Sequence, residues 1–220
     1  MCGIVGFIDR SNTTQKEQIV KNMMDTIVHR GPNSAGQFID EGAALGFRRL
    51  SIIDLEGGTQ PIKNEDGTKI ITFNGEIYNY QSIREDLIAK GHIFTTHADT
   101  EVLLHGYEEY GVDLLQKIRG MFAFVIWDTK KQELFGARDH FGIKPLYYAL
   151  MNGTFMYGSE IKSFLQHPNF VKELNKEALK PYMTFQYSAL DETFFKNVYR
   201  IKEGHYFTYK DGQLDIQQYW

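Results

Sequence analysis

The chain of 220 residues contains a single cysteine, Cys2, and only five prolines. One thiol excludes an internal disulfide and a metal site built from several thiolates, and it is typical of a reducing compartment. Basic residues are not in excess either, because the net charge is −4. This charge argues against nucleic acid as the main partner, since binding phosphate groups requires a basic surface.

Long apolar segments are also missing. The first residues lack the basic start and the extended apolar stretch of a secretory signal. No run approaches the roughly 18–20 apolar residues that cross a bilayer. We therefore expect a cytoplasmic protein without a membrane partner.

Apolar residues make up 42% of the chain and aromatic residues 14%, which is enough for one sizeable core. No repeat or linker divides the sequence, so residues 1–220 are expected to form one domain. The patterns predict strands, then helices, then strands again, and this order favours a layered α+β fold over a doubly wound parallel sheet.

Periodicity and turn residues predict the individual elements. Helices are expected over residues 15–29, 79–90 and 99–110 and from Asn175, with Asn79 and Asp99 as N-caps. Strands are expected over 2–8, 35–39, 44–53, 69–73, 121–128, 133–137, 146–150 and 154–158, followed by a hairpin at Asp211-Gly212.

Cys2 is the first candidate for chemistry. Removal of Met1 would leave Cys2 with a thiol and a free α-amine in one residue. Because α-amines have a pKa of about 7.7–8.0, this amine could accept the thiol proton near neutral pH. The alternative is an accidental cysteine whose thiol only packs. No histidine is assigned a catalytic role.

Three further elements are ambiguous when each is taken alone. Arg49 has the planar guanidinium that suits a carboxylate, but it could equally form half of a salt bridge. Asn74 and Gly75 offer the donors of an oxyanion hole or, alternatively, a tight turn. Asp99 could bind an ammonium group or cap a helix. Together with Glu76 and Cys2, these residues match the carboxylate, the ammonium and the amide of free glutamine.

The sequence resembles the N-terminal domain of asparagine synthetases over nearly its whole length. The strings that carry the resemblance are MCGIVGF, HRGPNSAG, RRLSIIDLEGGTQPI, FNGEIYNY, ADTE, GMFAFVIWD and ARDHFGIKPLYY. The resemblance implies an N-terminal-nucleophile hydrolase fold, a four-layer αββα sandwich of two antiparallel sheets. It also implies hydrolysis of L-glutamine to glutamate and ammonia through a γ-glutamyl thioester on Cys2.

The resemblance further implies the site residues. Arg49 would bind the glutamine α-carboxylate with main-chain groups of Leu50, Ser51, Ile52 and Ile53. Asn74 and Gly75 would form the oxyanion hole, while Glu76 and Asp99 would hold the α-ammonium group. No metal and no cofactor are expected in this domain.

Two departures from the family pattern are visible. Asn33 stands where the family usually has aspartate, and the chain lacks the Ser-Gly-Gly-rich loop of an ATP pyrophosphatase. Mg-ATP is therefore expected only in a covalently linked synthetase domain, which would use the ammonia to convert aspartate to asparagine. The chain is expected to be a fragment of such a protein rather than a stand-alone subunit, and a homodimer is left open.

Two alternatives to this function are retained. One is the glutaminase domain of another class II amidotransferase, and the other is a non-catalytic regulatory domain on the same fold.

Overall fold

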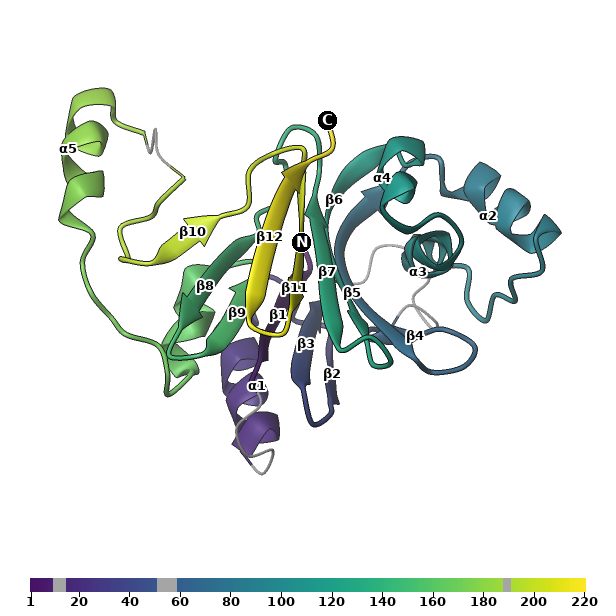
Figure 1. Ribbon diagram of the computed structural model, residues 1–220, viewed down its shortest axis with the longest axis horizontal. Coiled ribbons are helices and arrows are strands. Elements are labelled where there is room, and N and C mark those ends of the chain that lie inside the picture. The colour runs from purple at the N-terminus through teal and green to yellow at the C-terminus, as the bar shows by residue number, and fades with distance from the viewer. Residues whose placement is uncertain (10–14, 51–58, 188–190) are drawn as a thin grey trace.

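The computed structural model describes residues 1–9, 15–50, 59–187 and 191–220. Within these ranges, two six-stranded antiparallel sheets lie face to face (Figure 1). The first sheet has the order β10 (Val198–Arg200), β8 (Tyr147–Met151), β9 (Thr154–Gly158), β1 (Gly3–Ile8), β3 (Ala43–Arg49), β2 (Ser34–Ile39). The second has the order β12 (Gln213–Gln218), β11 (His205–Lys210), β7 (Glu133–Arg138), β6 (Gly120–Asp128), β5 (Lys69–Ile77), β4 (Ile62–Lys63).

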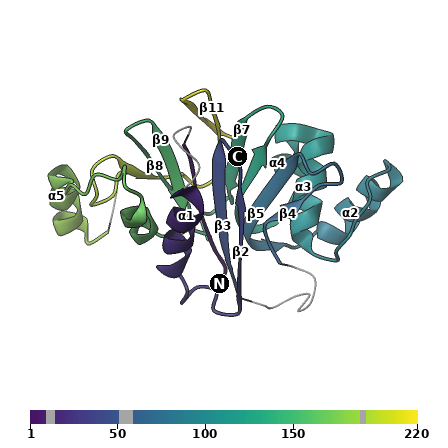
Figure 2. The ribbon, with the colours of Figure 1, turned by 90° about the horizontal axis from the view of Figure 1, so that it is seen from below.

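Helices cover the outer faces of both sheets, as the two views in Figures 1 and 2 show. Helix α1 (Lys16–Asp25) packs on β1 and β3 of the first sheet. The second sheet carries α2 (Tyr80–Ala89), α3 (Asp99–Tyr110) and α4 (Leu114–Lys117). Two 3₁₀ turns, η2 (Gly111–Asp113) and η3 (Ile161–Gln166), and helix α5 (Lys176–Phe185) complete the described elements. None of these helices is long and apolar enough to cross a membrane.

Three apolar cores separate the four layers. Because side chains alternate between the two faces of a strand, β1 sends Val5 and Phe7 toward α1, whereas Ile4 and Ile8 point toward the second sheet. Strand β6 divides its side chains in the same way, with Ala123, Val125 and Trp127 between the sheets and Phe122, Phe124 and Ile126 toward α3. The expected four-layer αββα arrangement is confirmed.

Several element boundaries differ from the sequence prediction. Helix α1 ends at Asp25 instead of His29, and β5 continues beyond Phe73 to Ile77. The short strands β4 and β10 were not predicted, because two or three residues carry no measurable periodicity. The hairpin at Asp211-Gly212 is confirmed, and both residues have a positive φ of 50° and 78°.

Of the two predicted N-caps, Asn79 does occupy the N-cap position of α2 but makes no side-chain cap, and Asp99 is wrong, because Ala98 is the N-cap of α3. Asn79 precedes α2, but its side chain donates to the Lys117 carbonyl at 2.9 Å and accepts from the Arg119 N–H at 2.8 Å. Asp99 is the first residue of α3, and its carboxylate accepts the N–H of Ile77 at 2.9 Å. Both side chains therefore bind segments outside their own helices.

Candidate active site

A pocket of about 110 Å³ opens at the end of the two sheets where β1 begins and β3 ends. Its walls are formed by the chain start, by residues of β3, β5, β6 and α3, and by the segments next to β3, β4, α3 and β7. The lining residues are Met1, Cys2, Phe47, Arg49, Leu50, Gln60, Phe73, Asn74, Gly75, Glu76, Ala98, Asp99, Thr100, Met121 and Lys144. Seven of the ten residues predicted for the site line this pocket. The other three, Ser51, Ile52 and Ile53, lie outside the described residues.

Strand alternation explains why the first of these side chains meet. Ile4 and Ile8 of β1 face the second sheet, so Cys2 lies on the same side and packs against the core between the sheets. In β3 the inward residues are Leu45 and Phe47, and Arg49 continues this series.

The neighbouring Arg48 points the other way. It forms an ion pair with Asp25 of α1 and donates to the Met24 carbonyl at 3.1 Å. The arginine pair is thus divided between the outer and inner faces of the first sheet.

Strand β5 supplies the opposite wall by the same rule. Ile70 faces the core between the sheets, and Asn74 and Glu76 follow it at even spacing. Asn74 and Gly75 are paired with Ala123 and Phe122 of β6. The alternative of a tight turn is therefore wrong, since both residues lie inside a strand.

The close approach of the β6 backbone requires glycine at position 75. A Cβ atom at this position would lie 2.2 Å from the Met121 carbonyl oxygen and 2.8 Å from the Phe122 Cα atom. Both contacts are with backbone that cannot move without breaking the β5–β6 pairing. Any larger residue would therefore displace the N–H that borders the pocket.

The Cys2 thiol is held by the backbone of Leu50. It donates to the Leu50 carbonyl at 3.6 Å and accepts from the Leu50 N–H at 3.4 Å. Burial raises the pKa of Cys2 above its ordinary value, while the Leu50 N–H and the Arg49 charge oppose this shift. The thiol form is thus favoured, and a proton acceptor is needed to generate the nucleophilic thiolate.

Met1 reaches into the same pocket. Its Sδ atom accepts from the Lys144 ammonium group at 3.4 Å. The Cys2 carbonyl is fixed by Arg30, whose Nε donates to it at 2.9 Å. The neighbouring His29 does not line the pocket, and its Nε2 atom lies 2.8 Å from Glu160 Oε1. With Met1 attached, the Cys2 nitrogen is an amide and has no lone pair available for a proton.

Asn74 has an unused hydrogen-bond donor. Its side chain is 1% exposed, and no described residue accepts from its Nδ2 atom. A buried donor without a partner destabilises a fold by about 1–3 kcal/mol. Such a group at a pocket wall is suited to an acceptor on a bound molecule.

Two carboxyl groups give the pocket a region of negative charge. Burial raises the pKa of Asp99 to about 6, repulsion from Glu76 adds to this shift, and the hydrogen bond from Ile77 opposes it. Burial also raises the pKa of Glu76, against the attraction of Lys144. A bound cation would relieve the repulsion between the two groups.

Several lining residues were missed by the sequence analysis. Buried Gln60 accepts from the Phe73 N–H at 2.6 Å and donates to Thr100 Oγ1 at 3.2 Å, so it joins β5 to α3. Lys144 is placed by Asp139, whose carboxylate accepts the Lys144 N–H at 2.9 Å. Lys144 lies in the family string ARDHFGIKPLYY and Gln60 in RRLSIIDLEGGTQPI, but no spacing marks either of them as a pocket residue.

Asn33, the departure from the family pattern, is exposed and donates its main-chain N–H to the Arg49 carbonyl at 3.0 Å. A group of side chains that could hold a metal ion, Glu65, His92, His105 and Glu108, lies outside the pocket.

Comparison with known proteins gives consistent results. The family model of the glutamine amidotransferase domain matches residues 1–220. Asparagine synthetase (glutamine-hydrolyzing) 1 of Bacillus subtilis (strain 168) is 47% identical over 224 residues, and asparagine synthetase (glutamine-hydrolyzing) 3 of the same organism is 37% identical. The alignments cover 100% of this chain but 35% and 36% of these relatives, so the chain spans about a third of their length.

Solved structures share the fold. A glutamine phosphoribosylpyrophosphate amidotransferase from B. subtilis has a TM-score of 0.72 at 18% identity, and its match covers 100% of this chain and 49% of that chain. A structure described as the allosteric regulatory enzyme of purine biosynthesis has a TM-score of 0.74 at 19% identity, with the same coverage. At these identities the likeness concerns the fold alone, and it confirms the expected N-terminal-nucleophile hydrolase fold. The chain therefore belongs to the glutamine amidotransferase domain family.

Proposed function

We propose that residues 1–220 hydrolyse L-glutamine to L-glutamate and ammonia at this pocket, with Cys2 as nucleophile. One observation carries the proposal. The only thiol of the chain shares a pocket with a buried amide donor that has no acceptor among the described residues, a buried arginine and two repelling carboxyl groups. These groups complement the amide, the carboxylate and the ammonium of one free amino acid.

The reaction would begin after loss of Met1. The free α-amine of Cys2 accepts the thiol proton, and the thiolate attacks the side-chain carbonyl carbon of glutamine. The tetrahedral oxyanion receives hydrogen bonds from Asn74 Nδ2 and the Gly75 N–H.

Collapse of this intermediate breaks the carbon–nitrogen bond, and the amine returns its proton to the leaving ammonia. A γ-glutamyl thioester remains on Cys2. Water, deprotonated by the same amine, hydrolyses this thioester to release glutamate and restore the thiol.

The remaining residues would orient glutamine. Arg49, with main-chain groups of residues 50–53, binds the α-carboxylate as a planar two-donor partner. Glu76 and Asp99 bind the α-ammonium group. Because the α-carboxylate and the α-ammonium group of glutamine would both be bound, the glutamine side chain would point toward Cys2.

The ammonia would serve a covalently linked synthetase domain that converts aspartate to asparagine. Support comes from the curated relatives, which are named asparagine synthetases and extend to about three times the matched length. Mg-ATP would bind to that domain, and residues 1–220 would need no cofactor. A cytoplasmic location fits the single cysteine.

The first prediction concerns the nucleophile and the base. Chains that have lost Met1 should release ammonia from glutamine and should take up one equivalent of a glutamine-like diazo-ketone at Cys2. Chains that retain Met1 should do neither, because the acylated nitrogen cannot accept a proton. Intact mass, labelling and ammonia release measured on the same samples test this expectation.

Cys2→Ala is the control for this experiment, and it should keep its circular dichroism spectrum while losing both labelling and turnover. Full activity of homogeneous Met1-retaining protein would exclude the amine as the base.

The second prediction separates binding from chemistry. Arg49 would meet the carboxylate equally in the ground and transition states, so Arg49→Ala should mainly raise KM. Asn74 would serve the oxyanion alone, so Asn74→Ala should lower kcat by roughly 10²–10³. Steady-state kinetics of both variants provide the test. Arg49→Lys should restore KM poorly, because one ammonium group cannot replace the planar guanidinium. The reverse pattern would show that the two roles are misassigned.

The third prediction concerns pH. Below its pKa of about 6 Asp99 is neutral and would no longer attract an ammonium group, so KM for glutamine should rise as the pH falls through this value. Asp99→Asn should raise KM at pH 7 by about 10–100-fold and weaken this pH dependence, leaving only the part due to Glu76. KM measured from pH 5 to 8 tests both expectations, with Asp113→Asn, an exposed aspartate of η2, as the matched control.

Stability should change in the direction opposite to the affinity for glutamine, because it should be higher at low pH, where the affinity is lower. Because the folded-state pKa of Asp99 lies above its ordinary value of 3.8, folding loses free energy as the pH rises between the two values. Asp99→Asn removes the buried charge and can still accept the Ile77 N–H. Its free energy of unfolding at pH 7 should thus be equal to or higher than that of the parent. A KM profile that keeps the parent's shape would contradict the assignment.

The fourth prediction identifies the acceptor. The longer protein, supplied with amide-¹⁵N glutamine, aspartate and Mg-ATP, should form ¹⁵N-asparagine. Mass spectrometry of the products measures the transfer. If ammonia is released but no labelled asparagine forms, the proposed glutamine hydrolysis stands and aspartate is excluded as the acceptor.

A further inference from the structure

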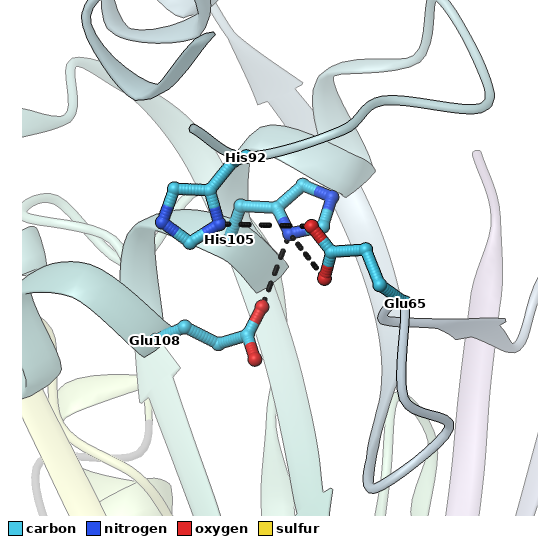
Figure 3. Close-up of side chains that lie close together, drawn as sticks. All are labelled: Glu65, His92, His105 and Glu108. Carbon is cyan, nitrogen blue, oxygen red and sulfur yellow. Dashed lines mark hydrogen bonds and ion pairs between the residues drawn. The ribbon is translucent and has the colours of Figure 1, made fainter. Parts of the chain in front are cut away.

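Four side chains converge on the outer side of the second sheet, outside the glutamine pocket. Glu65 lies in the turn between β4 and β5, His92 follows α2, and His105 and Glu108 lie one turn apart on α3 (Figure 3). Each offers one nitrogen or oxygen atom, and these atoms all lie within 4.8 Å of one another.

The spacing suits a tetrahedral ion. Zinc binds nitrogen and oxygen ligands at about 2.0–2.1 Å, so tetrahedral ligand atoms are separated by about 3.3–3.4 Å. His105 Nδ1 lies 3.1 Å from Glu108 Oε2 and 3.4 Å from Glu65 Oε2. His92 Nδ1 lies 3.8 Å from Glu65 Oε1. The other separations lie within 4.8 Å, so some ligand atoms would need to move by up to about 1–1.5 Å to reach the tetrahedral spacing.

Both histidines also have a carboxylate at their second ring nitrogen. His105 Nε2 lies 3.5 Å from Glu101 Oε1, and His92 Nε2 lies 3.6 Å from Glu109 Oε2. These are ion-pair distances, and buried His105 Nε2 has no hydrogen-bond partner among the described residues, so the ring would have to turn slightly to donate to Glu101. Histidines that bind metals usually donate their other N–H to a carboxylate, which fixes the ring orientation.

The carboxylates around the histidines are themselves held in place. Buried Glu101 accepts from the N–H groups of Thr95 and Thr96, each at 2.7 Å. The Oε1 atom of Glu108 accepts a hydrogen bond from Asn64 Nδ2 at 2.6 Å and lies 3.6 Å from the Lys69 ammonium group. The Oε2 atom of Glu108 therefore faces His105.

The same side chains could also form a network of ion pairs without a metal. Burial lowers the pKa of His105, but hydrogen bonds with Glu101 and Glu108 outweigh it and raise this pKa to about 9, so a protonated His105 would offset part of the negative charge. A divalent cation would neutralise Glu65 and Glu108 in its place, and the zinc titration below distinguishes the two.

We propose that Glu65, His92, His105 and Glu108 bind one divalent transition-metal ion, with zinc as the best match. Two imidazoles and two carboxylates form a ligand set typical of zinc, whereas magnesium and calcium prefer oxygen ligands alone. The ion would join the β4–β5 turn, the segment after α2 and helix α3, whose first residue is Asp99 of the pocket.

The test is a zinc titration of the tag-free, chelator-treated protein. The titration is done in a Cys2→Ala background, so that the thiol cannot bind zinc. One equivalent should bind in competition with a chromogenic chelator, and a millimolar excess of magnesium should not displace it. His92→Gln and Glu65→Gln should each weaken binding at least tenfold. His97→Gln changes an exposed histidine of the same segment and should bind as the parent does.

Two further measurements distinguish a metal site from a structural network. Glu109→Gln, which changes the carboxylate behind His92 and also removes the ion pair with Lys90, should weaken zinc binding by about 10–100-fold. Zinc should raise the Tm of the parent but not that of His92→Gln. The circular dichroism spectrum of each variant without zinc must match that of the parent. If His92→Gln does not fold, Glu65→Gln replaces it in the Tm measurement, because Glu65 is exposed.

The proposal would be overturned if the parent bound no zinc at micromolar concentrations, or if Glu65→Gln and His92→Gln bound it with parental affinity. Neither result depends on glutamine hydrolysis.

Discussion

The packing of two sheets through their inner faces is the constraint on which the candidate site depends. Ile4, Leu45 and Val125 exclude water between the sheets and thereby fix which face of each strand points inward. The alternation of side chains then carries this choice to the strand ends. Cys2 and Arg49 from one sheet and Asn74 from the other therefore meet at the same opening.

The polar groups at this opening are kept in states that the fold alone does not favour. Within the part of the chain that the structure describes, Asn74 has a buried donor without an acceptor, and burial raises the pKa values of both Cys2 and Asp99. Each of these features opposes folding by a modest amount, and the apolar cores offset this cost. Local conflict of this kind is typical of functional sites, where the unmet interaction is completed by a bound molecule.

Helix α3 connects the pocket with the proposed metal site. Asp99 begins the helix at the pocket, and His105 and Glu108 stand on its next turns. Between them, buried Glu101 holds the preceding segment through Thr95 and Thr96 and also faces His105. An ion bound at Glu65, His92, His105 and Glu108 would thus limit motion of the segment that leads to Asp99, with no contact to glutamine.

The sequence by itself determined the family, the layered α+β class and most strands, because strings such as RDHFGIKPLYY and strand periodicity are local properties. It also determined that the thiol and the α-amine belong to one residue, since covalent bonding needs no fold. The tertiary structure alone decided that Asn74 and Gly75 lie in a strand, because the pairing of β5 with β6 extends beyond the apolar run. It likewise decided that Asp99 accepts from Ile77, that Gln60 and Lys144 line the pocket, and that two histidines meet two glutamates. These contacts join segments far apart in the chain, and a pattern that repeats every two or four residues carries no information about them.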